Sequence, residues 1–372
     1  MALQGESLPS RAGTVSRSGS LFELVARQLS ALISRFGLQE QRRQILAAYQ
    51  AIGRESLDYP SGARPKAASA INHDGTPFQY ALTLGVPARI LAFLGDVGPL
   101  HGRGAERMAN NHRCLTDLAG WLATVDSLEL VEELLDGLTD GGSCDLLEEP
   151  AGPFWISAGF AAGHAPRLKI YINGRWGKQA DRWQRLDRFA TFFGLGESWH
   201  ELAEELRADL NPLGMALTLN SKSPPDGRIY LSAFGKTISD YEQLARASGS
   251  TQFNHYLRPF ARFLLGNDID YPTPTAVSSF GLSSGAGFEF KLEFCTHCLF
   301  ESDGKAARRL RSWLSAAAVD AGAYEDMLAI LEPAGLSENE NNLHCYAGIG
   351  VKRGEPYTSI YLKPNSLQYE QA

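Results

Sequence analysis

Four short stretches of the chain alternate charged or phenolic residues with apolar ones. They are 167–172, 228–232, 289–294 and 357–363. Successive side chains of a β-strand point to opposite faces, so each stretch predicts a strand with one polar and one apolar face. Lysine and arginine bind anionic oxygens, and tyrosine rings stabilise positive charge. A cavity with such walls would suit an anionic group that leaves a carbocation behind.

These polar positions recur along the chain at similar intervals. Tyr171 and Tyr230 are 59 residues apart, Tyr230 and Glu293 are 63 apart, and Glu293 and Tyr361 are 68 apart. A fixed interval of this kind is typical of a repeated supersecondary unit, which buries its apolar face against its neighbours. We therefore interpret the four stretches as one strand position of an internally repeated fold.

Helical and strand-like spacing alternate through the whole sequence. Helical patterns cover 21–53, 105–138, 178–210, 239–265 and 304–332,. Each is followed by a predicted pair of strands: 77–84 with 89–95, 154–159 with 168–173, 214–221 with 228–234, 276–282 with 287–294, and 343–352 with 357–363,. Five helix–helix–strand–strand repeats give ten antiparallel strands, and closure into a barrel removes the exposed sheet edges. We predict an α+β fold in which helices cover the apolar outer face of a ten-stranded barrel and polar side chains line its lumen.

Composition fits a globular protein. The chain has 372 residues, 44% of them hydrophobic and 21% charged,. A net charge of −7 argues against general affinity for nucleic acid or anionic membranes, and no apolar run approaches the ~20 residues of a membrane-spanning helix,. Residues 1–20 lack an apolar signal segment, so we expect a disordered tail before a single domain at 21–372. Five cysteines form no disulfide framework, which indicates the reducing cytoplasm,.

Several short motifs in this order carry a family resemblance. They are Gly75-Thr76-Pro77-Phe78-Gln79, Arg89, Lys169-x-Tyr171, Arg228-x-Tyr230, Lys291-x-Glu293, Tyr346 and Tyr361. From about residue 55 to 363 their sequence and spacing resemble the aromatic prenyltransferases of the dimethylallyltryptophan synthase type. The fold of that family is the ABBA or PT barrel, ten antiparallel strands around a solvent-filled centre inside a ring of helices.

The resemblance implies roles for the luminal residues. Diphosphate binding falls to the basic residues Arg89, Lys169, Arg228 and Lys291, with Lys363 as a fifth. Shielding of the allylic cation from water falls to Tyr171, Tyr230, Tyr346 and Tyr361,. Fixed cations stabilise the charge that develops on a leaving diphosphate.

Three positions depart from the family pattern. Gln79 stands where the family has an acidic residue that hydrogen-bonds an indole N–H. Asp226 replaces a common basic residue, and Glu293 replaces a tyrosine. Since an amide cannot ionise, Gln79 could only orient the acceptor, whereas Glu293, in phase with Glu289, is our candidate for the general base.

The expected activity is transfer of a prenyl group from its diphosphate to an electron-rich aromatic acceptor. Dimethylallyl is the first choice of donor, and tryptophan or another indole is the first choice of acceptor; a tyrosine, another phenol or a peptide side chain is the alternative. The sequence has no Asp-Asp-x-x-Asp motif, so no metal or other cofactor is expected. We expect a monomer or homodimer that binds neither nucleic acid nor membranes.

Two other classes of function stay open. The same lumen could belong to a non-catalytic carrier of a phosphorylated ligand, or to a scaffold whose lumen is filled by its own ion pairs, such as Lys291 with Glu293. Cys295-Thr296-His297-Cys298 has the composition of a metal or redox site. On a continuing strand, however, positions i and i+3 face opposite sides, so we interpret this segment as structural.

Overall fold

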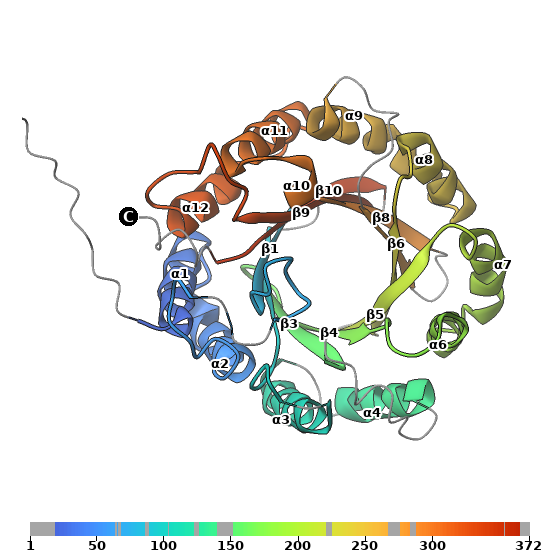
Figure 1. Ribbon diagram of the computed structural model, residues 1–372, viewed down its shortest axis with the longest axis horizontal. Coiled ribbons are helices and arrows are strands. Elements are labelled where there is room, and N and C mark those ends of the chain that lie inside the picture. Colours follow the sequence, from blue (N-terminus) through green and yellow to red (C-terminus); the bar gives the residue numbers. More distant parts are fainter. Residues whose placement is uncertain are drawn as a thin grey trace, which may run out of the picture.

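Ten antiparallel strands form a closed barrel with helices arranged around it (Figure 1). The computed structural model describes residues 19–63, 65, 68–85, 89–102, 104–122, 126–139, 152–220, 225–266, 276–282, 288–352 and 354–364. Each strand pairs with its sequence neighbours, and β10 returns to β1 with Leu362 opposite Tyr80. The predicted fold class is confirmed.

The strands begin and end within a few residues of the predicted positions. They are β1 (Phe78–Gly85), β2 (Ile90–Gly95), β3 (Phe154–Phe160), β4 (Arg167–Asn173), β5 (Asn211–Asn220), β6 (Asp226–Ala233), β7 (Ala276–Leu282), β8 (Phe288–Cys295), β9 (His344–Lys352) and β10 (Glu355–Leu362). Periodicity of two located them well because every strand has one face against the helices and one toward the lumen.

A pair of longer helices precedes each hairpin. The helices are α1 (Leu21–Arg35), α2 (Arg42–Gly53), α3 (Gly104–Leu122), α4 (Asp126–Thr139), α6 (Gln179–Phe192), α7 (Gly196–Leu206), α8 (Ile238–Ala247), α9 (Asn254–Leu265), α10 (Thr296–Leu299), α11 (Asp303–Ala316) and α12 (Gly322–Leu331), with 3-10 turns η1 (Gln39–Gln41) and η2 (Thr251–Phe253). The short α10 lies inside the ring of helices and packs on β9 (Figure 1). None of these helices combines the length and apolarity needed to cross a membrane.

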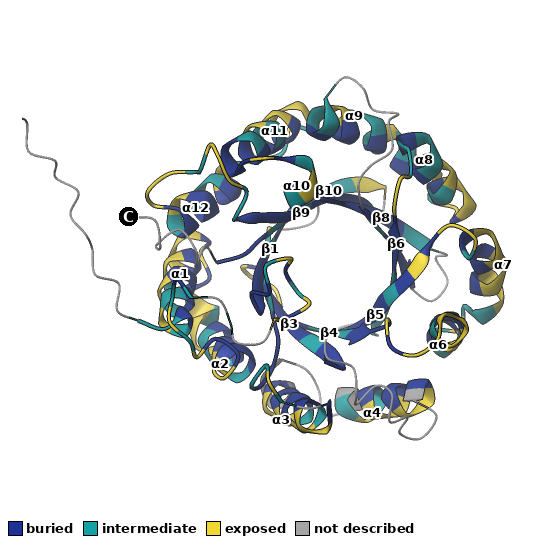
Figure 2. Cartoon of the chain, in the orientation of Figure 1, coloured by how far each residue is buried: buried dark blue, intermediate teal, exposed yellow. Residues whose placement is uncertain are grey.

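The apolar strand face packs against the helices. Trp199 of α7 is fully buried, and its ring lies 6.0 Å from the rings of both Phe280 and Phe288. Figure 2 shows the same sidedness around the ring, with buried residues on the barrel side of the helices and exposed ones outside. Burial of roughly 150–250 Å² for each aromatic side chain makes this interface the main hydrophobic core.

The few polar atoms on the outer strand face have partners in the helices. The Tyr80 hydroxyl donates to Gln28 Oε1 at 3.0 Å, and Trp313 Nε1 donates to Thr358 Oγ1 at 2.9 Å. A buried donor without a partner would cost about 1–3 kcal/mol. These bonds therefore help to fix the position of α1 and α11 on the barrel.

The start of α1 is tied down locally. Ser20 caps the helix through its Oγ, which accepts from the Glu23 N–H, and the Glu23 carboxylate accepts from the Ser20 N–H,. Ser20 also forms an isolated β-bridge with Pro60. Most of the predicted tail, residues 1–18, lies outside the described residues, and the single-domain assignment of 21–372 stays a prediction.

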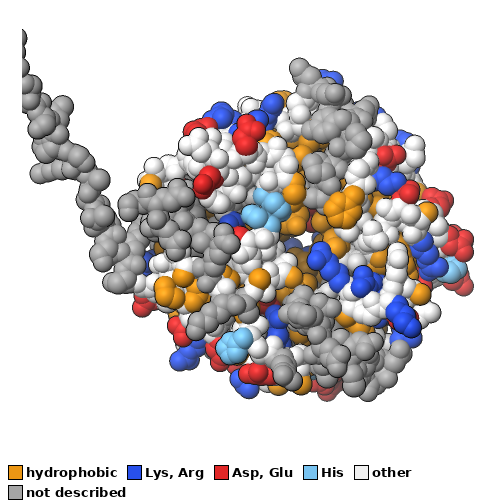
Figure 3. Space-filling model, viewed as in Figure 1, with side chains coloured by type: hydrophobic (Ala, Val, Ile, Leu, Met, Phe, Trp, Pro, Cys, Tyr) orange, Lys and Arg blue, Asp and Glu red, His pale blue; other side chains and the backbone are white. Residues whose placement is uncertain are grey.

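The antiparallel order gives the barrel two different ends. The odd-numbered strands β1, β3, β5, β7 and β9 finish at one end, which we call the hairpin end. The links between helices and strands lie at the other, the connection end, where β1 begins at Phe78 and β8 finishes at Cys295. Figure 3 shows an opening at the centre of the molecule, bordered by basic and hydrophobic side chains.

Candidate active site

Basic and phenolic side chains from four separate hairpins meet inside the barrel. Lys169 Nζ donates to the Tyr230 hydroxyl at 2.6 Å and lies 4.4 Å from the centre of the Tyr171 ring. The two rings are 5.8 Å apart. This contact is the first part of what we call the luminal cluster, which consists of Lys169, Tyr171, Arg228, Tyr230, Lys291, Glu293, Tyr357 and Tyr361.

A second contact within the luminal cluster joins β8 to β10. Lys291 Nζ donates to Glu293 Oε1 at 2.6 Å and to the Tyr361 hydroxyl at 2.9 Å. Both charged residues are 7% exposed. Lys291 and Glu293 lie two residues apart on the luminal face of one strand, so their contact needs only that strand. Tyr361 is brought to them because β8 pairs with β9 and β9 pairs with β10.

Arg228 stands between the two contacts and toward the hairpin end. Its guanidinium donates to Ser279 Oγ at 3.2 Å and approaches Glu289 Oε2 to 3.6 Å. The neighbouring strand has Gly281 opposite Arg228, and a Cβ added there would lie 2.9 Å from a guanidinium nitrogen. The glycine therefore leaves space in which the arginine extends over β7 toward Glu289 of β8.

Burial and mutual repulsion lower the pKa of Lys169 well below its ordinary value. Burial is the larger cause, followed by the charges of Arg228 and Lys291,. Enclosure in the barrel also raises the pKa of the Tyr171 and Tyr230 phenols, which stay protonated at neutral pH and can donate hydrogen bonds. The luminal cluster thus offers an anion several hydrogen-bond donors, and a bound anion would favour the protonated form of Lys169.

Glu293 is ionised despite its burial. Burial favours the protonated carboxyl, but Lys291, the Tyr361 hydroxyl and Lys169 together hold its pKa below the usual range,. The Tyr361 hydroxyl in turn has its pKa raised by burial and by the Glu293 charge. A carboxylate in contact with a lysine and a phenol can accept a proton once that lysine is engaged elsewhere.

A different group surrounds Gln79 at the connection end. Gln79 is buried, and its Nε2 donates to Asn72 Oδ1 at 3.0 Å. Asn72 is itself fixed, because its Nδ2 donates to the carbonyls of Thr76 and Phe78. The Cys345 thiol also donates to Asn72 Oδ1, at 3.1 Å. These bonds determine which end of the Gln79 amide donates.

Lys363 does not join the luminal cluster. It is 2% exposed and forms an ion pair with Asp74, which precedes β1 by four residues. Burial opposes ionisation of Asp74, but the charge and hydrogen bond of Lys363 outweigh it and lower the carboxyl pKa. The predicted fifth cation is thus already neutralised by an acid far away in the sequence.

Arg89 lies outside the lumen. Residue 89 is an even number of positions from Leu91 and Phe93, whose buried side chains face the helices, so its side chain falls on the same outer face,. Strand β2 begins only at Ile90, one residue later. The Arg89 guanidinium pairs with Asp320 at 2.9 Å, and its side chain is 41% exposed. It borders a 230 Å³ cavity with residues of the α1–α2 connection. The geometry does not bring this predicted diphosphate ligand to the other basic residues.

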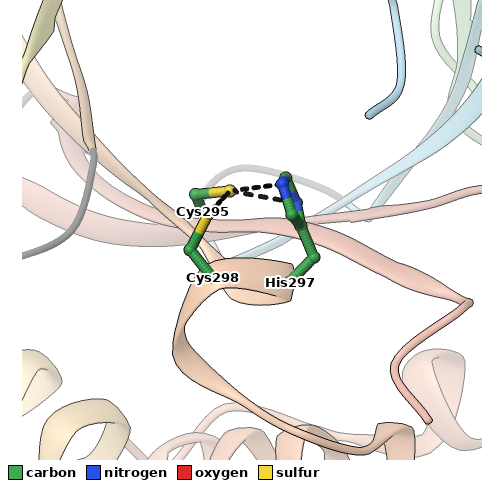
Figure 4. A group of neighbouring side chains, drawn as sticks. All are labelled: Cys295, His297 and Cys298. Carbon is green, nitrogen blue, oxygen red and sulfur yellow. Dashed lines mark hydrogen bonds between the residues drawn. The ribbon is translucent and has the colours of Figure 1, made fainter. Parts of the chain in front are cut away.

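The segment after β8 turns into a helix, contrary to our expectation of a continuing strand. Cys295 is the last residue of β8, and α10 begins at Thr296. The turn brings Cys295, His297 and Cys298 to one side, with one ligand atom of each within 4.8 Å of the others (Figure 4). The objection that their side chains face opposite sides was therefore wrong.

Comparison with solved structures identifies the fold. The chain superposes on 6-dimethylallyltryptophan synthase from Micromonospora olivasterospora, in complex with DMASPP and Trp, with a TM-score of 0.80 and 17% identity over 94% of this chain and 99% of that one. The chain is also similar to 5-dimethylallyltryptophan synthase from Streptomyces coelicolor, with a TM-score of 0.76 and 20% identity over 94% of this chain and 99% of that one. Its similarity to AnaPT from Neosartorya fischeri has a TM-score of 0.70 and 12% identity over 95% of this chain and 96% of that one. The chain has the PT-barrel fold of these prenyltransferases. No family model and no curated protein sequence matches it.

Within this PT barrel, three luminal or near-luminal residues were not predicted. Tyr357 has the parity of Tyr361, and its ring centre lies 5.8 Å from Lys291 Nζ. Strand periodicity alone could have found it. Ser279 and Asn72 gave no comparable signal, because a serine or a loop asparagine is common and only the tertiary contacts with Arg228 and Gln79 distinguish them.

The last predicted tyrosine, Tyr346, lies beside Tyr361 of the luminal cluster, on its side toward the connection end. Tyr346 and Tyr361 are paired across β9 and β10, and their rings meet edge to face at 6.3 Å. Burial raises the pKa of the Tyr346 phenol. Of the predicted set, the PT barrel therefore brings together Lys169, Tyr171, Arg228, Tyr230, Lys291, Glu293, Tyr346 and Tyr361.

Proposed function

We propose that this protein transfers a dimethylallyl group from its diphosphate to an indole, with tryptophan as the leading acceptor. The observation that carries the proposal is the convergence of Lys169, Arg228 and Lys291 with tyrosine rings inside one barrel. Structures of the same fold hold the corresponding molecules: PriB has been solved with L-tryptophan and dimethylallyl thiolodiphosphate, and with product diphosphate.

The first step is cleavage of the bond between C1 of the allyl group and the diphosphate oxygen. The bonding electrons leave with the diphosphate, whose growing charge is stabilised by Lys169, Arg228 and Lys291. Arginine offers planar, two-point contact with phosphate oxygens, and lysine acts as a point charge. Loss of one such donor typically costs about 10²–10³-fold in rate.

The allylic cation left behind needs electron-rich surfaces and exclusion of water. Tyr171 and Tyr230 form one wall and Tyr361 forms another, each already within 4.4–5.3 Å of a lysine ammonium. Interaction of an aromatic face with a cation contributes about 0.5–2 kcal/mol, more when the site is dry. The same rings keep water from quenching the cation before the acceptor attacks.

Attack by an aromatic carbon on C1 forms the new bond and leaves a positively charged ring that loses a proton to restore aromaticity. We assign that proton to Glu293. In the ligand-free protein Lys291 holds the Glu293 pKa down. When diphosphate oxygens draw the Lys291 ammonium toward themselves, that restraint weakens and Glu293 becomes the stronger base at the moment when one is needed.

The charge balance of the lumen is consistent with a reaction that uses no metal. When Lys169 is protonated, Lys169, Arg228 and Lys291 contribute three positive charges, and Glu289 and Glu293 contribute two negative ones, which leaves a balance of +1. Fixed basic groups of this kind can do the work of charge neutralisation that Mg²⁺ does elsewhere. We propose on this basis that transfer is independent of divalent metal.

Gln79 is proposed to orient the acceptor. Asn72 accepts a hydrogen bond from the Gln79 Nε2, which leaves the amide oxygen as the end able to accept an indole N–H. Unlike a carboxylate, this oxygen carries no full charge, so the site would also accept a phenol or an aromatic side chain of a peptide. These acceptors are the second choice.

The proposal is tested by incubating the purified protein with dimethylallyl diphosphate and a panel of indoles, tyrosine and aromatic peptides. An enzyme releases pyrophosphate and yields an acceptor heavier by one dimethylallyl group in mass spectrometry. Tight binding of the diphosphate without release of pyrophosphate with any acceptor would instead support a carrier. Exclusion of all phosphorylated ligands from the lumen would support the scaffold alternative.

A further inference from the structure

We propose that Cys295, His297 and Cys298 bind one thiophilic d¹⁰ metal ion of the zinc class at the connection end of the barrel. The three residues supply two sulfurs and an imidazole from one turn of chain (Figure 4). This site lies apart from the luminal cluster, and its proposal does not depend on the transfer reaction.

The geometry brings the ligand atoms near metal-binding distances. Cys295 Sγ lies 3.2 Å from Cys298 Sγ and 3.0 and 3.2 Å from the two ring nitrogens of His297. Tetrahedral zinc with Zn–S bonds of about 2.3 Å and Zn–N bonds of about 2.1 Å places its ligand atoms roughly 3.5–3.8 Å apart. The side chains must therefore open by roughly half an ångström, which rotation of Cys298 and His297 can supply.

The local backbone explains why the three ligands converge. Cys295 has the parity of Glu293 and Lys291 and so faces the lumen, where it lies opposite Tyr346. The chain then enters the helical turn α10, which brings Cys298 to the side of Cys295. A strand that continued past Cys295 would have separated the two sulfurs.

The surroundings favour an incoming ion. Cys298 is exposed and gives access from solvent, whereas Cys295 is buried. His73 stacks on His297 with ring centres 3.9 Å apart. A neutral imidazole offers the lone pair of one ring nitrogen to a metal ion.

The donor set selects the kind of ion. Two thiolates and one imidazole suit Zn²⁺, Cd²⁺ and Cu⁺ and disfavour Mg²⁺ and Ca²⁺, which prefer oxygen. A bound cation stabilises the thiolate form of a coordinating cysteine. Three protein ligands leave a fourth position for water or another donor.

Cd²⁺ titration of the reduced, chelator-treated full-length protein tests the site, since cadmium thiolates absorb in the ultraviolet. We expect one Cd²⁺ ion to bind per protein, with a rise in ultraviolet absorbance that corresponds to about two cadmium–thiolate bonds. Added Zn²⁺ should compete for the site and abolish this rise. Cys298→Ser should weaken binding at least about tenfold, and His297→Ala likewise. Cys114→Ala, which removes a thiol buried in α3, should leave the titration unchanged.

Three results would overturn the proposal. One is a titration without a saturable thiolate step. Another is an identical step in wild type and in the Cys295→Ser/Cys298→Ser double variant. The third is a protein 2 Da lighter even after reduction, with no metal bound, because a persistent Cys295–Cys298 disulfide would leave no sulfur ligands. Thermal unfolding of each variant without metal establishes that the fold is intact, so a loss of binding reports on the ligands.

Discussion

The ammonium of Lys169 lies 2.6 Å from the hydroxyl of Tyr230, although 61 residues separate them in the chain. They belong to β4 and β6, with β5 between them, so only the curvature of the barrel brings their side chains together. The contact links a basic residue that would hold a diphosphate to a ring that would face an allylic cation. The contact therefore links both halves of the proposed chemistry through one interaction between β4 and β6.

Removal of the Lys169 ammonium should abolish most turnover and spare the fold. For Lys169→Met we expect a rate loss of about 10²–10³-fold, because one donor to the leaving group is gone. Stability should hold or rise, since a neutral side chain of similar length avoids burying a charge. Steady-state pyrophosphate release and thermal unfolding measure the two effects. Arg308→Ala, on the exposed surface of α11, is the matched control, and a Lys169→Met rate equal to its rate would contradict the diphosphate site.

Binding of pyrophosphate should be accompanied by proton uptake. The pKa of Lys169 is depressed in the ligand-free protein, and a nearby anion raises it,. Between the free and the bound pKa, binding adds a proton, so affinity falls as the pH rises through that window. Calorimetric titrations in buffers of different ionisation enthalpy measure the uptake. The Lys169→Met variant should take up fewer protons than the wild type when pyrophosphate binds. Equal proton uptake by the two proteins would mean that a group other than Lys169 is protonated.

Arg89→Ala should retain near wild-type turnover. The guanidinium pairs with Asp320 outside the lumen, and a partly exposed ion pair of this type contributes about 0–1 kcal/mol to stability,. The resemblance to the prenyltransferases makes the opposite prediction, because it assigns Arg89 to the diphosphate. Turnover assays of Arg89→Ala beside Arg228→Ala decide between them: a comparable loss in both would mean that Arg89 reaches the donor during the reaction.

Gly350→Ala should displace Tyr357 from the luminal cluster. A Cβ at this position would come within 2.5 Å of the Tyr357 ring and hydroxyl, so the ring must move away from Lys291. Overpacking should cost about 1–3 kcal/mol of unfolding free energy. Loss of one cation–ring contact should slow turnover by about 2- to 30-fold. Gly137→Ala, in open space on α4, is the control and should raise stability by up to about 1 kcal/mol,.

Turnover should persist in excess EDTA. The proposed charge neutralisation is done by side chains, and the soft site at Cys295, His297 and Cys298 lies outside the luminal cluster. The test compares the turnover rate with and without EDTA, on protein whose metal content has been determined, and we expect the two rates to be equal. Complete loss of activity that magnesium restores would contradict the metal-free mechanism.

Strand periodicity located the barrel well because it is a local property. In 288–294, the phenylalanines and Leu292 had to face the helices, and this alone placed Lys291 and Glu293 in the lumen. The same reasoning failed where the chain leaves the strand. Arg89 precedes β2 on its outer parity, and the chain turns helical after Cys295, so alternation misplaced both. Element ends depend on packing and hydrogen bonds that a repeat of two does not encode.

The sequence by itself determined the repeat, the two faces of each strand and therefore which side chains enter the lumen. The tertiary structure decided which of them meet and which are neutralised. Lys363 is two residues beyond Tyr361, but Asp74 forms an ion pair with it from 289 residues away, whereas Lys169 of β4 contacts Tyr230 of β6. Alternation is fixed by the backbone of each strand, but partners at such separations are set by barrel closure and strand register, which bring together residues that no local pattern relates.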